Sequence, residues 1–454
     1  MKRFSSILLA ASSILSLAAP ALAATRPHYG GTLRVGLRET PQLLDPAFLA
    51  SSRCQSLSAL IFEPLLTLDS QGRLQPLLAA SWQADPGNQR WRFLLQSGVS
   101  FHDGTSFDAG AVAASLRSHN PNWRVLAAGD SVVIETASPD PELPRELALG
   151  RNAISHGDSE HPSGTGPFSI AEWTPGKHLR LGANPQYWGG GRPFLDGIDV
   201  QFGLPDRDQM MALDLGRLDL AEVAPENIRR GRSDNRRILD SEPEELVALI
   251  FARPPRSEAE AHVRDALASA LNTTAMNEVL LQGEGDAVSS LLPNWLSGYA
   301  FLFHPPQNTE HQSAQAPGNQ PLTSLTLAYD AADPLARLIA DRVLLNARDV
   351  GVRIDLTTSA NYDVALRRIS IPCPEPQLAL LELARALELA RPQFASRSIA
   401  DLYAAERGLL ESHRVIPLLH LRAAIAVRPN VRGVGILAQG TWQLTDTWLI
   451  PEKP

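Results

Sequence analysis

The sequence has little cysteine and little lysine, and no long apolar run follows its first residues. Only Cys54 and Cys373 occur in 454 residues, which is too few for a cysteine-rich zinc site. The chain carries 41 Lys+Arg against 49 Asp+Glu, a formal net charge of −8, and its lysines are Lys2, Lys177 and Lys453 alone. Because an acidic chain without clustered basic side chains does not neutralise phosphates, this composition argues against a nucleic acid as partner.

The first residues carry an export signal. Lys2 and Arg3 precede an apolar stretch of small residues, and residues 21–23 supply the small-x-small pattern of a signal peptidase site, so cleavage is expected between Ala23 and Ala24. No later segment reaches ~18 uninterrupted apolar residues, the length of a membrane span. No cysteine stands at the cleavage point, so a lipid anchor is not expected. We therefore expect signal peptide 1–23 and a soluble periplasmic protein.

Export would place the two cysteines in an oxidising compartment, which permits a disulfide between them. Cys54 and Cys373 are far apart in the sequence. Whether they pair depends on the distance between their Cα atoms in the fold, and the sequence leaves this open.

The order of strand-like and helix-like segments predicts a mixed α/β architecture. Because 454 residues exceed the size of one compact core, at least two lobes are expected. Residues 31–37 and 90–96 are strand-like, and 107–117 favour a helix that starts at Asp108. The segment 305–321 is polar and rich in proline, which is typical of a surface loop.

The second half of the chain has the clearest helix and strand signals. Ser257 and Glu260 form a capping box before apolar residues at helical spacing up to Leu271. Asp333 and Pro334 start another helix, with apolar residues at 335, 338, 339 and 345, and Gly351 ends it. Residues 352–357 then alternate as a strand. Helix–turn–strand units of this kind predict layered α/β lobes.

Several short motifs suggest catalytic or metal chemistry, and each has a simpler interpretation. His102, Asp103 and Gly104 are typical of a turn, and the glycines of 164–168 and 188–192 lack the ending of a phosphate-binding loop. The segment 156–161, with two histidines and two acids, could hold a metal but is typical of a solvated loop. Residues 129–131 have no nucleophile-elbow pattern. We expect no metal, no cofactor and no enzymatic activity.

Six segments in order resemble one known family. They are 33–48 (LRVGLRETPQLLDPAF), 62–82, 93–116, 164–202, 211–223 (MALDLGRLDLAEV) and 263–293. They look like successive segments of the family 5 extracellular solute-binding proteins, the dipeptide, oligopeptide and nickel-type receptors of ABC importers. The match is collinear over nearly the whole mature chain.

The resemblance implies a two-lobed α/β fold like the type II periplasmic binding proteins, with mixed sheets and flanking helices. It implies lobe I from 24–242 plus 424–454 and lobe II from 243–423. A peptide or another small organic ligand would be enclosed between the lobes, and an inner-membrane ABC permease would be the protein partner. We expect a monomer that does no chemistry.

One segment departs from the family. In peptide-binding relatives a lobe II strand, matched here to QLALLEL at 377–383, leads into a loop with Trp and Asp, where an acid receives the ligand's α-amino group. Here no Trp follows and the first Asp is Asp401, while Glu382 is the nearest acid. Because a buried ammonium needs a counter-charge, unmodified peptides are expected to bind weakly. A ligand with an anionic or neutral head could still use Arg53 or Arg385.

The candidate ligand contacts are Ser51, Ser52, Arg53, Tyr329, Asp330 and Arg385. The first three follow the first strand, where relatives contact ligand, but a solvated helix start is the alternative. The Tyr–Asp pair ends a strand of lobe II, a common ligand position in α/β folds, although the acid could simply cap a turn. Arg385 could receive a carboxylate or face solvent.

The sequence therefore supports three functions. The first is the periplasmic solute-binding component of an ABC importer. The second is a degenerate relative that binds a protein and acts as an adaptor or sensor. A secreted hydrolase is the third and the least supported.

Overall fold

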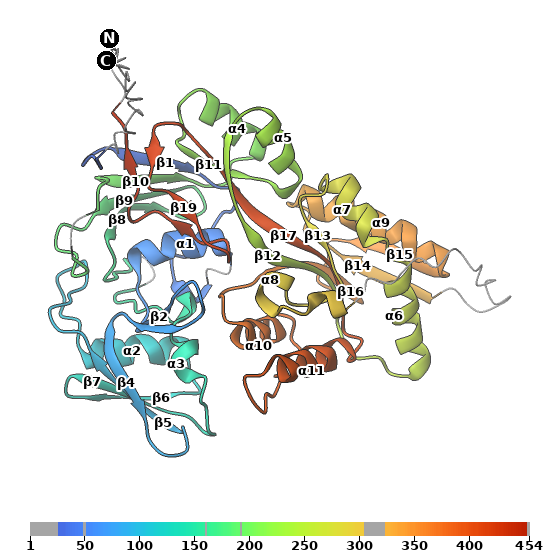
Figure 1. Cartoon of the computed structure of the whole chain (residues 1–454), viewed down its shortest axis with the longest axis horizontal. Coiled ribbons are helices and arrows are strands. Elements are labelled where there is room, and N and C mark those ends of the chain that lie inside the picture. The colour runs from blue at the N-terminus through green and yellow to red at the C-terminus, as the bar shows by residue number, and fades with distance from the viewer. Residues whose placement is uncertain (1–25, 49–50, 159–160, 191–192, 304–322, 452–454) are drawn as a thin grey trace, which may run out of the picture.

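The structure, a computed structural model, describes residues 26–48, 51–158, 161–190, 193–303 and 323–451 (Figure 1). The expected signal peptide, its cleavage point between Ala23 and Ala24, and the expected surface loop 305–321 lie outside these residues. Among the described residues, no helix is long and apolar enough to cross a membrane.

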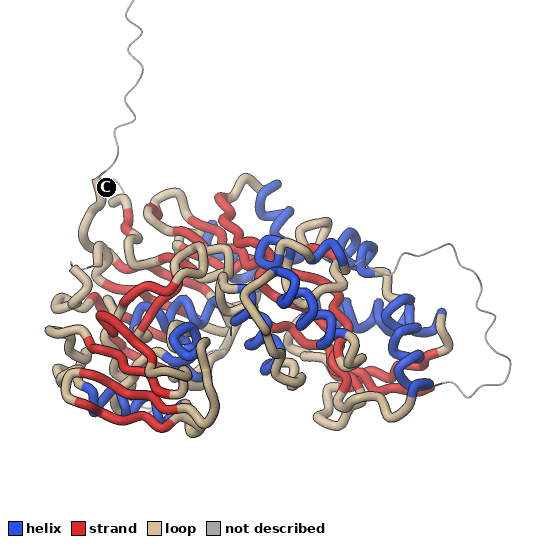
Figure 2. Tube along the Cα trace, turned by 60° about the horizontal axis from the view of Figure 1, so that its bottom comes forward, coloured by secondary structure: helices blue, strands red, loops and turns tan. Residues whose placement is uncertain are grey.

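An eleven-stranded mixed sheet runs through both halves of the molecule, as the strands in Figure 2 show. Its strands are β1 (Thr32–Gly36), β8 (Phe168–Thr174), β9 (His178–Ala183), β10 (Gly197–Gln201), β11 (Leu220–Val223), β12 (Arg237–Phe251), β13 (Asp286–Ala287), β14 (Thr323–Ala328), β15 (Val352–Thr357), β16 (Val364–Ser370) and β17 (Val415–Val427). The order is β15-β14-β16-β12-β17-β11-β1-β10-β9-β8, with β13 paired to β17. The long antiparallel strands β12 and β17 connect the two halves.

The first half of the sheet is built around β1, which runs parallel to β10 and β11. Leu33 and Val35 of β1 are completely buried against Ile198 and Val200 of β10. This core continues into α1 (Ser52–Ile61), whose Leu57 is also buried. Because apolar residues alternate along these short strands, one face of this part of the sheet is buried in the protein core.

A separate four-stranded antiparallel sheet belongs to the same half of the chain. It has the order β4-β5-β7-β6, with β4 (Ala79–Ala84), β5 (Arg90–Leu95), β6 (Arg124–Ala128) and β7 (Ser131–Glu135). Helix α2 (Ala109–His119) covers it through Val112 and Leu116. Asp108 caps this helix as expected, because its carboxylate accepts a hydrogen bond of 2.9 Å from Ala111 N.

The other half has helices on both faces of the sheet. Helices α6 (Glu258–Ala270), α7 (Thr273–Leu280) and α9 (Pro334–Asp349) cover one face, and α8 (Asn294–Ser297), α10 (Pro376–Ala386) and α11 (Ile399–Leu410) cover the other (Figure 1). Their apolar side chains pack on opposite faces of β12, so that Val247 and Leu249 face the first group and Leu246 and Ala248 the second.

The remaining elements are short. They are α3 (Leu143–Glu146), α4 (Asp206–Asp214), α5 (Ile228–Ser233), β2 (Leu66–Leu68), β3 (Leu74–Pro76), β18 (Val431–Arg432), β19 (Gly435–Ile436), β20 (Trp442–Gln443), β21 (Trp448–Leu449), and the 3-10 turns η1 (Pro46–Phe48), η2 (Gly150–Asn152), η3 (Pro225–Asn227) and η4 (Ala300–Leu302).

We refer to the two halves as lobe I and lobe II, and the boundaries 24–242 plus 424–454 and 243–423 remain a proposal. It is supported by the separate apolar cores of the two halves. The β12–β17 ladder also shifts register between Asp240 and Pro243 and between Pro243 and Glu245. An interrupted ladder beside a proline bends more easily than a regular one, so a hinge fits there.

Most of the elements expected from the sequence are confirmed. Residues 31–37, 90–96 and 352–357 contain β1, β5 and β15. Ser257 caps α6, and Asp333 caps α9 with Pro334 at its first position.

The expected apolar face of α9 was partly wrong. Leu338 and Leu345 are 46% and 49% exposed, whereas Leu335 and Ile339 are buried. Leu338 and Leu345, seven residues apart, therefore share a second stripe that faces solvent.

The expected strand at 377–383 was wrong, because these residues form α10. Glu375 caps the helix by accepting a hydrogen bond of 2.7 Å from Leu378 N, and Pro376 occupies its first position. All residues from Gln377 to Ala384 are buried. A helix buried on every side has the same continuous apolar sequence as a buried strand, and the high helix propensity of alanine and leucine agrees with the outcome.

Candidate functional site

A cavity of about 510 Å³ lies between the two lobes. Lobe I lines it with Glu39, Ala47, Ser51, Gln55, Leu149, Gly150 and Arg151, and lobe II with Glu245, Arg368, Ile369, Ser370, Pro372, Glu382, Arg385 and Ala386. Its volume is within the range of sites for small organic ligands, roughly 300–1,000 Å³. We call it the interlobe cavity.

One end of the interlobe cavity is cationic. Arg151 Nη2 and Arg385 Nη2 both bind the carboxylate of Glu382, at 2.8 and 3.0 Å. Arg151 Nη1 is buried and has no hydrogen-bond partner among the described residues, and the Arg385 side chain is 65% exposed. Glu146, the next acid, is itself paired with Arg391 at 3.3 Å. Two guanidinium groups thus share one carboxylate, which leaves capacity for an anionic group.

Another part of the cavity wall contains Glu39, which follows β1. Its carboxylate accepts a hydrogen bond of 2.6 Å from the Ser51 hydroxyl and one of 2.9 Å from the Cys54 thiol. Ser51 also caps α1 by accepting from Cys54 N at 3.1 Å. Because burial and the neighbouring Glu39 carboxylate both disfavour a thiolate, the pKa of Cys54 is raised, and the thiol stays a hydrogen-bond donor at neutral pH.

A buried charge network lies behind this wall. Arg53 is 7% exposed, and its guanidinium lies 3.1 Å from Glu222, 3.5 Å from Glu39 and 3.8 Å from Glu244. Arg38 binds Glu222 at 2.6 Å. Burial opposes the charge of Glu222, but Arg53 and Arg38 outweigh it and hold its pKa at about 2. The Glu222 carboxylate is therefore ionised at neutral pH.

The network contains more carboxyl groups than guanidinium groups. Its arginines are Arg38, Arg53 and Arg368, and its carboxyl groups are Glu39, Glu222, Glu244, Glu245 and Asp333. The excess of carboxylates makes this wall anionic when all are ionised. The lining of the interlobe cavity therefore carries charges of both signs, with a cationic group at Arg151 and Arg385 and an anionic group at Glu39 and Glu245.

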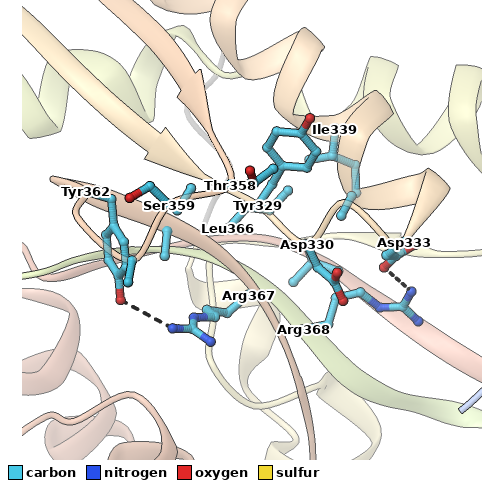
Figure 3. Close-up of a pocket in the computed structure, with 15 residues that line it drawn as sticks. Tyr329, Asp330, Asp333, Ile339, Thr358, Ser359, Tyr362, Leu366, Arg367 and Arg368 are labelled. Atoms are coloured by element: carbon cyan, nitrogen blue, oxygen red, sulfur yellow. Dashed lines mark hydrogen bonds and ion pairs between the residues drawn. The ribbon is translucent and has the colours of Figure 1, made fainter. Parts of the chain in front are cut away.

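The ligand contacts predicted from the sequence do not all lie in one cavity. Ser51 and Arg385 line the interlobe cavity. Arg53 is not among the lining residues, because the buried acids surround its guanidinium, and the side chain of Ser52 lies outside the described part of the structure. Tyr329 and Asp330 line a second cavity of about 570 Å³ in lobe II (Figure 3).

Sequence reasoning missed Glu39, Arg151 and Glu382 as cavity residues. Glu39 could have been suspected, because it follows a strand in an α/β fold. Arg151 belongs to a short 3-10 turn, and Glu382 was placed on a strand. No local pattern shows that these two meet from positions 231 residues apart.

The segment after which the departure from the peptide receptors was expected, 377–383, belongs to the helix α10 and not to a strand. The lobe II strand next to the cavity is β16, and residues 371–375 (IPCPE) follow it, with neither Trp nor Asp. Their only acid, Glu375, caps α10 and pairs with Arg397 at 3.3 Å. Glu375 does not line the interlobe cavity, whereas Glu39 and Glu245 line it from other elements.

The remaining motifs have structural roles. Gly104 has a φ of +82° in the turn after Phe101, and Gly164 and Gly166 approach the backbone of residues 60 and 61 too closely for a side chain. Cys54 and Cys373 are both free thiols. Within the part of the chain that the structure describes, no cluster of three His, Cys, Asp or Glu side chains could hold a metal; of the segment 156–161, residues 159 and 160 lie outside that part.

A two-lobed α/β fold joined by long strands, with a polar cavity between the lobes, defines a binding protein of the type II periplasmic class. Solved structures of that class match the whole fold. The murein tripeptide binding protein of Escherichia coli has a TM-score of 0.78 at 17% identity and covers 94% of this chain and 99% of its own. A dipeptide binding protein from Pseudoalteromonas, solved with Met-Leu, has a TM-score of 0.76 at 16% identity and covers 92% and 100%.

The chain belongs to the bacterial extracellular solute-binding proteins, family 5, whose model matches residues 73–368. Among curated relatives, a glutathione-binding protein of Pectobacterium atrosepticum is 25% identical over 58% of this chain and 56% of its own length. The nickel-binding periplasmic protein of Escherichia coli is 25% identical over 68% of each chain. The chain thus spans little more than half the length of the first of these relatives. Family and fold are those of binding proteins.

Proposed function

We propose that this protein is the periplasmic solute-binding component of an ABC importer and that it encloses a small dipolar organic ligand, such as a short peptide, in the interlobe cavity. The observation that carries the proposal is the pair of oppositely charged groups in the cavity lining. A ligand carboxylate would bind Arg151 and Arg385, and a ligand ammonium would lie toward Glu39. Glu39 would thereby supply the counter-charge, since Glu375, the acid after β16, does not line the cavity.

The unpaired edge of β16 supports a peptide-like ligand. β14 pairs with β16 only at Val364 and Ala365, and beyond Ala365 this edge has no strand partner among the described residues. Arg368, Ile369 and Ser370 on that part of the strand line the interlobe cavity. An extended ligand with amide groups could therefore hydrogen-bond to the strand edge.

The contacts between the lobes support enclosure of the ligand. Arg151 binds Glu382 and Arg391 binds Glu146 across the lobe boundary, and Arg397 pairs with Glu142 in the same way. Leu149 of lobe I packs into the apolar cluster of α10 and α11. These contacts hold the two lobes against each other beside residues that line the cavity.

The names of the relatives agree with a small organic ligand. Those described above are named for a tripeptide, a dipeptide, glutathione and nickel. The first three compounds carry both ammonium and carboxylate groups. At this level of identity the relatives support a ligand class and not one compound.

Calorimetric titration with three peptide pools tests the proposal. The pools are free di- and tripeptides, an N-acetylated copy and a C-amidated copy. The free pool should bind most tightly. This revises the weak binding of unmodified peptides expected from the sequence, because Glu39 lines the cavity and offers a counter-charge. Amidation should weaken binding about tenfold or more, because a hydrogen bond between charged groups contributes ~1.5–3 kcal/mol. Acetylation should weaken it similarly if Glu39 receives the ammonium.

Two variants assign these losses to residues. Arg151→Met with Arg385→Met should bind the free pool as weakly as the parent protein binds the amidated pool. Arg407→Met removes an exposed arginine of α11 that pairs with Glu411 at 3.4 Å, lies over the Tyr403 ring and lines neither cavity, so this variant should bind like the parent. If no pool binds to the intact protein and none raises its melting temperature, the proposal is wrong and the adaptor hypothesis replaces it.

A further inference from the structure

Arg368 lies between two cavities. It is one of the residues lining the interlobe cavity, and it also lines the second cavity of about 570 Å³, together with Tyr329, Asp330 and Tyr362. Figure 3 shows the second cavity, with Arg368 at the same side as Asp330 and Asp333. Among the described residues, Arg368 alone belongs to both linings.

Residues of the strand β16 line both cavities. Residues 365–368 of β16 line the second cavity, and residues 368–370 line the interlobe cavity. This part of β16 has no strand partner on its β14 side beyond Ala365, within the described residues. A ligand extended along the strand edge from one cavity would therefore reach the other at Arg368.

The Arg368 side chain forms an ion-pair bridge at this point. Its Nη1 binds Asp333 Oδ2 at 2.6 Å, and its Nε and Nη2 bind Glu245 Oε2 at 3.0 and 2.5 Å. Asp333 is fixed as the N-cap of α9, since its carboxylate accepts from Leu335 N at 3.0 Å. The bridge thus links β16 to β12 through Glu245 and to the N-cap of α9 through Asp333.

The bridge is difficult to displace. The side chains of Arg368, Asp333 and Glu245 are 15%, 15% and 9% exposed, so moving the guanidinium away would leave two largely buried carboxylates without their partner. Breaking a buried ion pair by removing one member is strongly unfavourable. A ligand that pushed against Arg368 would have to overcome this loss.

We propose that Arg368 determines the length specificity of the ligand site. The bridge from Arg368 to Asp333 and Glu245 ends the interlobe cavity and restricts it to short ligands, the size of a di- or tripeptide. The second cavity is the space that a longer ligand would occupy if the bridge were absent. This inference rests on the proposed function.

A matched pair of variants tests the inference. Arg368→Ala with Glu245→Gln and Asp333→Asn removes the bridge together with its charges, and asparagine retains the cap of α9. The control is Arg236→Ala with Asp214→Asn and Asp234→Asn. Arg236 in lobe I also holds two carboxylates, at 2.8 and 2.6 Å, but lines neither cavity.

The assay is native mass spectrometry with an equimolar set of free-amine alanine peptides from dimer to hexamer. The parent protein and the control should retain the short members only. Because Glu245 and Arg368 line the cavity, the readout is the ratio of long to short peptides bound by each protein. In the bridge variant the affinity for the tetramer to the hexamer, relative to that for the dimer, should rise by about tenfold or more, equivalent to ~1.4 kcal/mol. The single change Arg368→Lys, which keeps a cation but cannot bind both carboxylates in the same way, should give an intermediate profile.

The other outcomes separate the two proposals. If the parent already binds hexamers as well as dimers, or if the bridge variant keeps the parent's length profile, the role of Arg368 is refuted while the proposed function stands. If neither protein binds any peptide although both melt cooperatively, the proposed function fails and this inference fails with it.

Discussion

His420 should make the stability of lobe II dependent on pH. It lies on β17, completely buried, and its Nε2 is 3.0 Å from the carbonyl oxygen of Leu291. Nδ1 has no hydrogen-bond partner among the described residues. Nε2 therefore carries the proton and donates it, and a second proton on Nδ1 would place an unpaired charge in the interior. Burial accordingly lowers the pKa of His420 to about 4, from an ordinary value of 6.5.

The sign of the effect follows from proton binding. Below about pH 6.5 the unfolded chain binds a proton at this histidine and the folded chain does not, so stability falls as the pH falls until the folded pKa is reached. The full difference between the two pKa values corresponds to ~3 kcal/mol. Between about pH 7.5 and pH 5, some 2 kcal/mol of that should be lost.

The perturbation is His420→Gln, because glutamine keeps a donor for the Leu291 carbonyl and does not titrate. Urea unfolding followed by far-ultraviolet circular dichroism, at about pH 7.5 and pH 5, gives the two stabilities for each protein. The parent should lose ~2 kcal/mol more than the variant over this range. Glu406, whose pKa is raised by burial, is present in both proteins and cancels in the comparison.

An exposed histidine provides the control. His262→Gln, on the solvent side of α6, should leave the pH dependence of the parent unchanged. If the His420→Gln protein and the parent lose the same free energy between the two pH values, His420 is protonated in the folded state, and its environment is not as closed as the structure indicates.

Three further predictions concern stability and shape. Arg53→Met should lower the free energy of unfolding by ~3–5 kcal/mol, because Glu222 and Glu244 stay buried without it; an unchanged urea midpoint would contradict this. Ser257→Ala should lower the free energy of unfolding by ~1 kcal/mol, and Ser257→Asp should lower it much less, because only aspartate keeps an N-cap for α6. If the two variants lose the same free energy of unfolding, the capping role is refuted. Arg391→Ala with Arg397→Ala should increase the radius of gyration of the ligand-free protein in small-angle X-ray scattering, and no increase would mean that these pairs do not hold the lobes together.

Local signals predicted much of the fold correctly. The caps at Asp108, Ser257 and Asp333 were readable because a cap is a contact between residues two or three positions apart. The strand at 352–357 was readable because its alternation matches one buried face. The family followed from six segments in order, and the family model confirms it.

The helix at 376–386 was not readable from its apolar pattern. It is buried on all sides, between β12, α11 and the cavity, so the pattern contains neither a period of two nor one of 3.6. Only its neighbours in the fold decide which conformation the segment adopts.

The ligand site was determined by the tertiary structure. The sequence alone placed Arg53 beside the ligand, on the basis of its position after β1, yet three acids from β11, β12 and the loop after β1 enclose it. Conversely, Arg151 and Glu382 meet only because lobe I and lobe II come together. Local sequence patterns depend on contacts within one helix or strand and can therefore be read from the sequence. The charge of the cavity depends on side chains from strands and loops that are far apart in the sequence and meet only in the folded chain.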